Sequence, residues 1–154
     1  MTRRHDGLMP LTHDHHHALA HSRRLLLAAG GDAQELLWES QRFLDFFRED
    51  TLHHFREEEE VVFPLAVADK RATALLSSVV AEHLQIHGMV ARLAAEVGQG
   101  RVQEKTANGL AEALAAHIRL EEREVFPMLE KVVSDDQLRS IKLEPRNRHA
   151  SALA

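Results

Sequence analysis

The sequence predicts an all-α protein, an antiparallel up-down-up-down four-helix bundle with a short C-terminal helix. Leu, Ala, Glu and Arg fill the long segments with helical periodicity, and the alternation of β-branched residues that is typical of strands is scarce. Glycine and proline divide the chain into four long segments joined by short loops, which is the organisation of an up-down bundle. With 154 residues, the chain is long enough for one compact domain with a sizeable core.

The first two helices are predicted from their end signals. We expect the first helix to open after Pro10, with Thr12 as its N-cap, and to stop at residues 30–31, a Gly-Gly pair. Asp32 and Glu35 form a D-x-x-E pattern that resembles a capping box. A second long helix should therefore begin there.

The remaining helices follow from prolines, glycines and one further capping pattern. The second helix should run to about Pro64, where a kink or an end is expected because proline lacks a backbone N–H. A third helix should cover about 72–97 and a fourth about 104–131, with Pro127 disturbing its last turns. An S-x-x-Q pattern at 134–137 predicts a short fifth helix.

Composition excludes several functional classes. Cysteine is absent, which excludes disulfides, thiolate catalysis and cysteine-ligated iron-sulfur or zinc sites. The net charge of −5 gives no electrostatic reason to expect nucleic-acid binding. The sequence has neither a membrane-spanning apolar run nor the apolar core of a signal peptide, so we expect no membrane partner and a cytoplasmic location. Residues 1–143 are expected to form the domain and 144–154 a loosely ordered tail.

Histidine is enriched, and several histidines stand in a repeated motif. The chain has twelve histidines, which in a cysteine-free protein points to metal or proton chemistry. The motif HxxxEExxVFP occurs twice, 63 positions apart. Three pairs stand four residues apart and therefore share a helix face: His54 and Glu58, His117 and Glu121, and His83 and His87. The other acidic residues of the first motif, Glu57, Glu59 and Glu60, are interpreted mostly as a solvated face.

Histidines of all four helices can reach one level of the bundle. In an antiparallel hairpin, residues at the same height lie about equally far from the turn. The four histidines considered are His16, His54, His83 and His117. The positions halfway between successive members fall in or near a predicted loop: Glu35, the Ala68–Asp69 pair and Gly100. The two acidic motifs would then form equivalent walls of one site.

The histidine of the first helix must be chosen among the neighbours in HDHHH at 13–17. His83 is followed by apolar residues at +3 and +10, and His16 has leucines at both positions. His15 breaks that correspondence. We therefore favour His16, with His15 in reserve.

The number of candidate ligands predicts the kind of metal site. Five imidazoles and two carboxylates are too many for one tetrahedral zinc and suit two metals bridged by carboxylates. A mixture of imidazole and carboxylate favours iron or manganese over metals that prefer soft ligands. The candidates are His16, His54, Glu58, His83, His87, His117 and Glu121.

These residues carry a family resemblance. The pattern H…HxxxE…HxxxH…HxxxE, with HxxxEExxVFP in duplicate, resembles the hemerythrin-like HHE cation-binding domain over about 11–131. The resemblance implies a non-haem di-iron centre in a four-helix bundle that carries or senses dioxygen or responds to related small molecules. It carries over all seven candidates as ligands of two irons.

Two positions depart from the family patterns. Hemerythrins place an Asp five residues after the last histidine, whereas this chain has Glu121 at +4 and Glu122 at +5. Glu121 is the preferred second bridge, and Glu122 is the reserve. In many HHE relatives the position of His87 is not a histidine, so its presence favours the ligand set of the oxygen carriers.

The sequence thus favours a metal- and oxygen-binding protein over a dedicated enzyme. Its expected cofactor is two irons, which other divalent metals can replace, and its expected partner is dioxygen or a related oxidant such as NO or peroxide. Two alternatives stay open, a metal-gated regulatory module with a separate protein partner and a di-iron peroxidase or catalase-like enzyme. A ferritin-like oxidase is disfavoured because no histidine has a Glu three residues before it.

Overall fold

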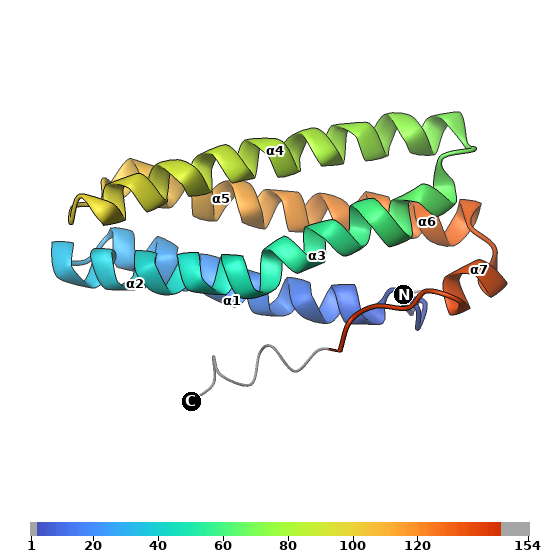
Figure 1. Cartoon of the computed structure of the whole chain (residues 1–154), viewed down its shortest axis with the longest axis horizontal. Coiled ribbons are helices and arrows are strands. Elements are labelled where there is room, and N and C mark those ends of the chain that lie inside the picture. Colours follow the sequence, from blue (N-terminus) through green and yellow to red (C-terminus); the bar gives the residue numbers. More distant parts are fainter. Residues whose placement is uncertain (1–2, 146–154) are drawn as a thin grey trace.

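The computed structural model describes residues 3–145, and this part of the chain is helical without strands. Eleven helical elements follow one another along it. Some are continuous in space, so that α2 to η3 form one long rod and α5 to α6 another (Figure 1). The elements are α1 (Met9–Ala29), α2 (Ala33–Phe46), η1 (Phe47–Thr51), α3 (Leu52–Glu57), η2 (Glu58–Val62), η3 (Phe63–Ala66), α4 (Lys70–Gly98), α5 (Glu104–Leu120), η4 (Glu121–Val125), α6 (Phe126–Val132) and α7 (Asp135–Arg139).

The long helices pack side by side as a bundle (Figure 1). α1 contacts both α2 and α5, while α4 contacts both α5 and α2. The short helix α7 lies at one end of the bundle, and the chain after it crosses beneath α3 and α6 (Figure 1). Among the described residues, no helix is long and apolar enough to cross a membrane. Most of the predicted tail, residues 146–154, lies outside the described residues.

The helix ends agree with the predictions except at the start of α1. Asp32 caps α2 by accepting from the Glu35 N–H, and Ser134 forms a capping box with Gln137 at α7. α1 instead begins at Met9, with proline in its first turn. Proline suits that turn because the N–H groups there have no partner within the helix.

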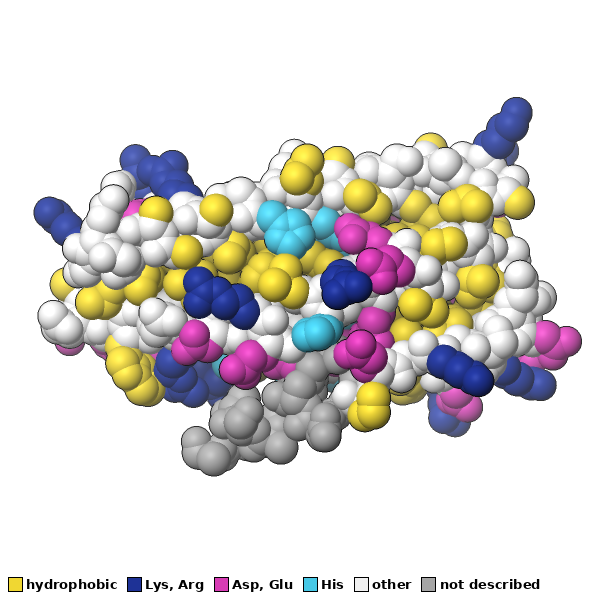
Figure 2. All heavy atoms as spheres, in the orientation of Figure 1, with side chains coloured by type: hydrophobic (Ala, Val, Ile, Leu, Met, Phe, Trp, Pro, Cys, Tyr) yellow, Lys and Arg dark blue, Asp and Glu magenta, His cyan; other side chains and the backbone are white. Residues whose placement is uncertain are grey.

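Two apolar clusters divide the interior of the bundle. One contains buried side chains such as Leu25, Phe43 and Leu110, and the other contains side chains such as Leu11, Val62 and Phe126. Along each long helix, a stretch with histidine or glutamate separates the residues of the two clusters. On the face seen in Figure 2, histidine and acidic side chains gather midway along the bundle, with apolar side chains on both sides. The polar layer is therefore held between two dry regions of core.

Three π-helical turns interrupt the long rods, and two of them start at a glutamate of the repeated motif. η2 begins at Glu58 and η4 at Glu121, and the N–H five residues later bonds to that glutamate's carbonyl in each case. Pro64 and Pro127 follow soon after. Proline cannot donate to the carbonyl four residues earlier, so an ordinary α-helix would be broken here. The expected disturbance at both prolines takes the form of a π turn, a feature often found at functional sites.

Candidate metal centre

Six buried side chains from the four long helices meet in the polar layer. They form two groups that share both glutamates, and the candidate ligand atoms within each group lie within 4.8 Å of one another. The His15 group contains His15 and His54, and the His83 group contains His83 and His117, each together with Glu58 and Glu121. The side chains of both glutamates are 0% exposed.

The two glutamates each turn one oxygen toward each group. On the side of the His15 group, Glu58 Oε1 lies 2.8 Å from His54 Nε2, and Glu121 Oε2 lies 2.8 Å from His15 Nε2. On the other side, Glu58 Oε2 lies 3.3 Å from His83 Nε2, and Glu121 Oε1 lies 3.1 Å from His117 Nε2. This is the arrangement of two carboxylates that can bridge a pair of cations.

The far nitrogen of each of these imidazoles contacts a carboxylate on another long helix. For three of the four, that helix is the preceding one in the chain. Asp14 on α1 lies 3.0 Å from Nδ1 of His54, and Glu59 on η2 lies 2.9 Å from Nδ1 of His83. The ring of contacts closes with two more, Glu82 to His117 at 3.1 Å and Glu122 to His15 at 2.6 Å.

This ring of carboxylates fixes the orientation and tautomer of the imidazoles. A carboxylate accepts the Nδ1 proton, so the Nε2 lone pair of each imidazole is free to face the centre. Histidines that bind metals commonly have such a carboxylate partner, which orients the ring and makes it a stronger ligand.

Among the described residues, the atoms that face the centre have no hydrogen-bond partner outside the cluster. They are the four Nε2 atoms of the histidines and all four carboxylate oxygens of the two glutamates. Buried polar atoms without partners are costly, and buried carboxylates need positive charge nearby. A set of nitrogen and oxygen atoms arranged in this way fits metal cations.

Without a cation, protons must balance the buried carboxylates. Burial opposes the charged form of His54, but the carboxylate of Glu58 raises its pKa well above the ordinary value. Burial likewise opposes the charge on His83, yet Glu121 and Glu58 raise its pKa to about 10. Burial would raise the pKa of Glu121, but the imidazole of His117 holds it well below its usual range. Metal binding would therefore have to displace protons from these imidazoles.

A comparison with known families identifies this arrangement. The family model described as the hemerythrin HHE cation-binding domain matches residues 6–129. The chain belongs to the hemerythrin HHE cation-binding family. No curated protein and no solved structure matches the chain. The matched region contains both groups and all four carboxylates around them, so the cluster lies in the part of the chain that defines the HHE domain.

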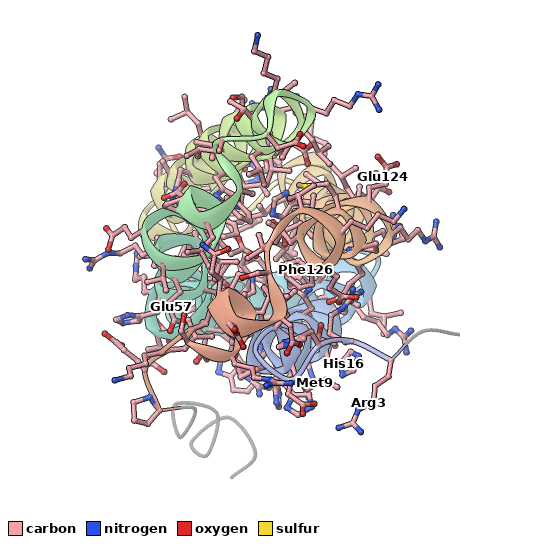
Figure 3. The ribbon with its side chains drawn as sticks, turned by 90° about the vertical axis from the view of Figure 1, so that its right-hand side faces the viewer. Arg3, Met9, His16, Glu57, Glu124 and Phe126 are labelled. Carbon is pink, nitrogen blue, oxygen red and sulfur yellow. The ribbon has the colours of Figure 1, made fainter. Side chains whose placement is uncertain are left out.

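Five of the seven ligands predicted for the HHE site lie in the two groups: His54, Glu58, His83, His117 and Glu121. The predicted His16 does not. Its side chain is exposed, and it lies at the outside of the bundle in Figure 3. The reserve candidate His15 is 2% exposed and takes the place in the cluster. A helix turns by 100° per residue, and the turn from His15 to His16 carries the second side chain from the interior to the surface.

His87 also lies outside both groups. It is half-buried, and its ring meets Phe47 at 5.8 Å and Phe55 at 5.6 Å, both edge-on. Phe55 itself stacks on His83 at 3.8 Å. An apolar ring thus occupies the space beside His83 that a fifth imidazole would have to reach.

Sequence reasoning missed the carboxylates behind the histidines. Glu59 was expected on a solvated face but contacts His83, and Glu122, the reserve bridge, contacts His15. Glu57 is buried and accepts the Glu144 N–H, whereas Glu60 is exposed as expected. One pattern could have found two of the four supporting carboxylates, Asp14 and Glu82, because they directly precede His15 and His83 in the sequence.

A small cavity adjoins the His15 group. It leaves about 10 Å³ for the centre of a water-sized sphere, which is roughly the room needed for one water molecule. Three imidazoles of the centre, His15, His54 and His117, line it. The rest of its wall is mainly apolar, with Ala18, Phe46, Phe55, Leu114 and Ile118, and includes Asp14, Asp50 and Thr51.

Proposed function

We propose that this HHE domain holds two iron ions in its polar layer and binds or senses dioxygen or a related small oxidant there. The observation that carries the proposal is the pair of four-ligand groups sharing Glu58 and Glu121. Within residues 3–145, their eight buried ligand atoms have no hydrogen-bond partner outside the cluster. The proposed fold is an up-down-up-down four-helix bundle, and a cytoplasmic location stays a prediction from the sequence.

The proposed ligands are the two histidines of each group together with the shared glutamates. Histidine and carboxylate without sulfur suit iron or manganese better than metals that prefer thiolates. Each group offers four protein ligands, which would complete a tetrahedral zinc site but leaves open positions on a metal that takes five or six. A small molecule needs such an open position to bind.

The cavity beside the His15 group supports a small ligand. With room for about one water-sized sphere, it suits a molecule of the size of dioxygen or NO and is too small for an organic substrate. Its apolar walls, including Phe46 and Leu114, limit access of bulk water. Two ferrous ions held side by side can supply two electrons to dioxygen.

The chain's own residues would tune this chemistry through protons and orientation. The Nδ1 contacts to Asp14 and Glu122 hold the imidazoles of His54 and His15 in place at the edge of the cavity. Because both glutamates are fully buried between dry clusters, their charges act in a medium of low dielectric constant. The layer is therefore arranged before any ligand enters.

Metal analysis after reconstitution with ferrous iron under argon tests the first half of the proposal. We expect two irons per chain. One iron per chain, or one tightly bound zinc with no second metal, would contradict a two-metal centre. Other divalent metals can replace iron, so the preparation must start from metal-free protein.

The second half is tested by exposing the reduced, iron-loaded protein to dioxygen and following its visible absorption. A reversible change would support carriage. Rapid irreversible oxidation would favour a sensor or a redox enzyme, and adding hydrogen peroxide would then test for turnover. If the protein binds two irons but its absorption changes with none of dioxygen, NO and peroxide, the proposed class of ligand would be contradicted.

A further inference from the structure

The N-terminal segment reaches the candidate centre through one arginine. Arg4 Nη2 donates to Glu122 twice, to the carboxylate oxygen Oε2 at 3.0 Å and to the backbone carbonyl at 2.9 Å. The other carboxylate oxygen of Glu122, Oε1, contacts His15 Nδ1 at 2.6 Å and accepts from the Thr12 hydroxyl at 2.8 Å. Glu122 therefore stands between the guanidinium and the imidazole, with each oxygen engaged.

A second route joins the same two residues. The guanidinium carbon of Arg4 lies 5.2 Å from the centre of the Phe126 ring, within the range of a cation–π contact. The same ring stacks on His15, with the ring centres 5.3 Å apart and an interplanar angle of 13°. Phe126 is fully buried and points into the bundle in Figure 3. Arg4 thus contacts both side chains that hold His15, the carboxylate of Glu122 and the ring of Phe126.

Arg4 is itself held in this position. Its Nη1 pairs with Glu130 at 2.8 Å, and only 15% of its side chain is exposed. The neighbouring Arg3 differs, because its side chain is 80% exposed and pairs only locally with Asp6. Figure 3 shows Arg3 directed away from the bundle. The two arginines are therefore a matched pair, one built into the structure and one at its surface.

We propose that Arg4 is a positioning residue of the metal centre, which holds Glu122 and Phe126 against His15 and so sets the affinity of the His15 group. This inference rests on the proposed two-metal function. Without the guanidinium, the Glu122 carboxylate would be held only through Oε1, by Thr12 and His15, so its contact with His15 Nδ1 should be less firmly fixed.

The size of the effect follows from the distance to the metal. Replacing a residue that directly supports a metal-binding histidine commonly weakens metal affinity by about 10–100-fold. Arg4 acts one residue further away, so we expect Arg4→Met to weaken the binding of one of the two ferrous ions by about 3–10-fold. The other ion, in the His83 group, should keep its affinity.

The test is a ferrous-iron titration of the full chain under argon, in competition with a coloured chelator. Arg4→Met should weaken one binding step, and Arg3→Met should leave both steps unchanged. Arg4→Lys should restore part of the loss because lysine keeps the charge without the two-pronged geometry. Glu130→Gln removes the other ion pair of Arg4 without changing Glu122, so it should weaken the same binding step by less than Arg4→Met does.

A double-mutant cycle separates positioning from general destabilisation. If Arg4 acts through Glu122, Arg4→Met should cost little further affinity in a Glu122→Gln background. The same loss in both backgrounds would overturn the inference, as would a weaker binding step in Arg3→Met that equals the one in Arg4→Met. A wild-type chain that binds fewer than two irons would instead refute the proposed function. Two tight irons in both wild type and Arg4→Met would refute only the role of Arg4.

Discussion

The His15 group and the His83 group have the same ligand types, yet their surroundings differ. Behind the His15 group, the supporting carboxylates of Asp14 and Glu122 are 6% and 26% exposed, and Glu122 is held by Arg4. Behind the His83 group, the side chains of Glu59 and Glu82 are 35% and 34% exposed. The duplicated motif thus repeats the ligands without repeating the environment.

The difference teaches that burial of the supporting residues can make two similar sites unequal. Water can replace a carboxylate that already faces solvent, whereas a buried carboxylate leaves an unsatisfied Nδ1–H when it is removed. We therefore expect the His83 group to depend less on its supporting carboxylates. The cavity borders mainly the His15 group, so the group with the more rigid support also has the space for a small ligand.

The largest effect on metal binding should come from replacing Glu58, because both groups share it. Glu58 gives one oxygen to each group, so Glu58→Ala should lower the occupancy of both irons together. We expect metal analysis to fall from two irons to less than one per chain. Glu60→Ala is the matched control because Glu60 is exposed and pairs with Arg56. Loss of only one iron in Glu58→Ala would mean that Glu58 is a terminal ligand.

A smaller effect, confined to one group, should follow from replacing His15, and its neighbour His16 on α1 is the control. His15→Ala should remove a ligand from the His15 group and leave the second ion bound, whereas His16→Ala should change neither. Iron content and titration curves of the two variants measure this directly. The opposite result would restore the preference for His16 that the sequence suggested.

The fold was predictable because its signals are local. Helix periodicity, the Asp32 cap and the Ser134 capping box each act within a few residues, and the all-helical structure and the family are confirmed. The start of α1 was set wrongly at Thr12, since proline in a first turn left the cap position ambiguous. The π turns η2 and η4 were foreseen only as a disturbance at the prolines.

The choice of His16 shows where the sequence pattern and the structure differ at the site. Leucines at +3 and +10 were taken to mark the core side, but Leu19 is only half-buried and Leu26 is 42% exposed. After His15, the same positions hold Ala18 and Leu25, which are 5% and 0% exposed. A small alanine at a tightly packed position carries little hydrophobic signal, so the sequence pattern did not indicate which side of this helix is buried. The contact of Glu59 with His83 joins two helices, so no pattern within one segment indicates which histidine Glu59 supports.

The supporting carboxylates sharpen the comparison between the two groups. Asp14→Asn should weaken the binding of the ion in the His15 group by about 10-fold, because it replaces a buried charged partner of His54. Glu82→Gln should weaken the binding of the ion in the His83 group by only about 2–3-fold, since water can reach His117 and replace the carboxylate of Glu82. Ferrous-iron titrations of both variants measure the difference. Equal losses would mean that burial of the support does not matter.

A negligible effect on metal binding is also expected for His87, the predicted ligand that lies beside the His83 group without belonging to it. Its ring touches Phe47 and Phe55 rather than the shared glutamates, so His87→Ala should leave two irons bound with unchanged absorption and oxidation rate. The lost packing of a half-buried ring should cost about 1 kcal/mol of stability, visible as a melting temperature lower by a few degrees. Loss of one iron, or faster oxidation, would instead mean that Phe55 moves aside when metal binds. His87 would then complete the His83 group as a fifth imidazole, and the inequality between the groups would lie in their ligands as well as in their surroundings.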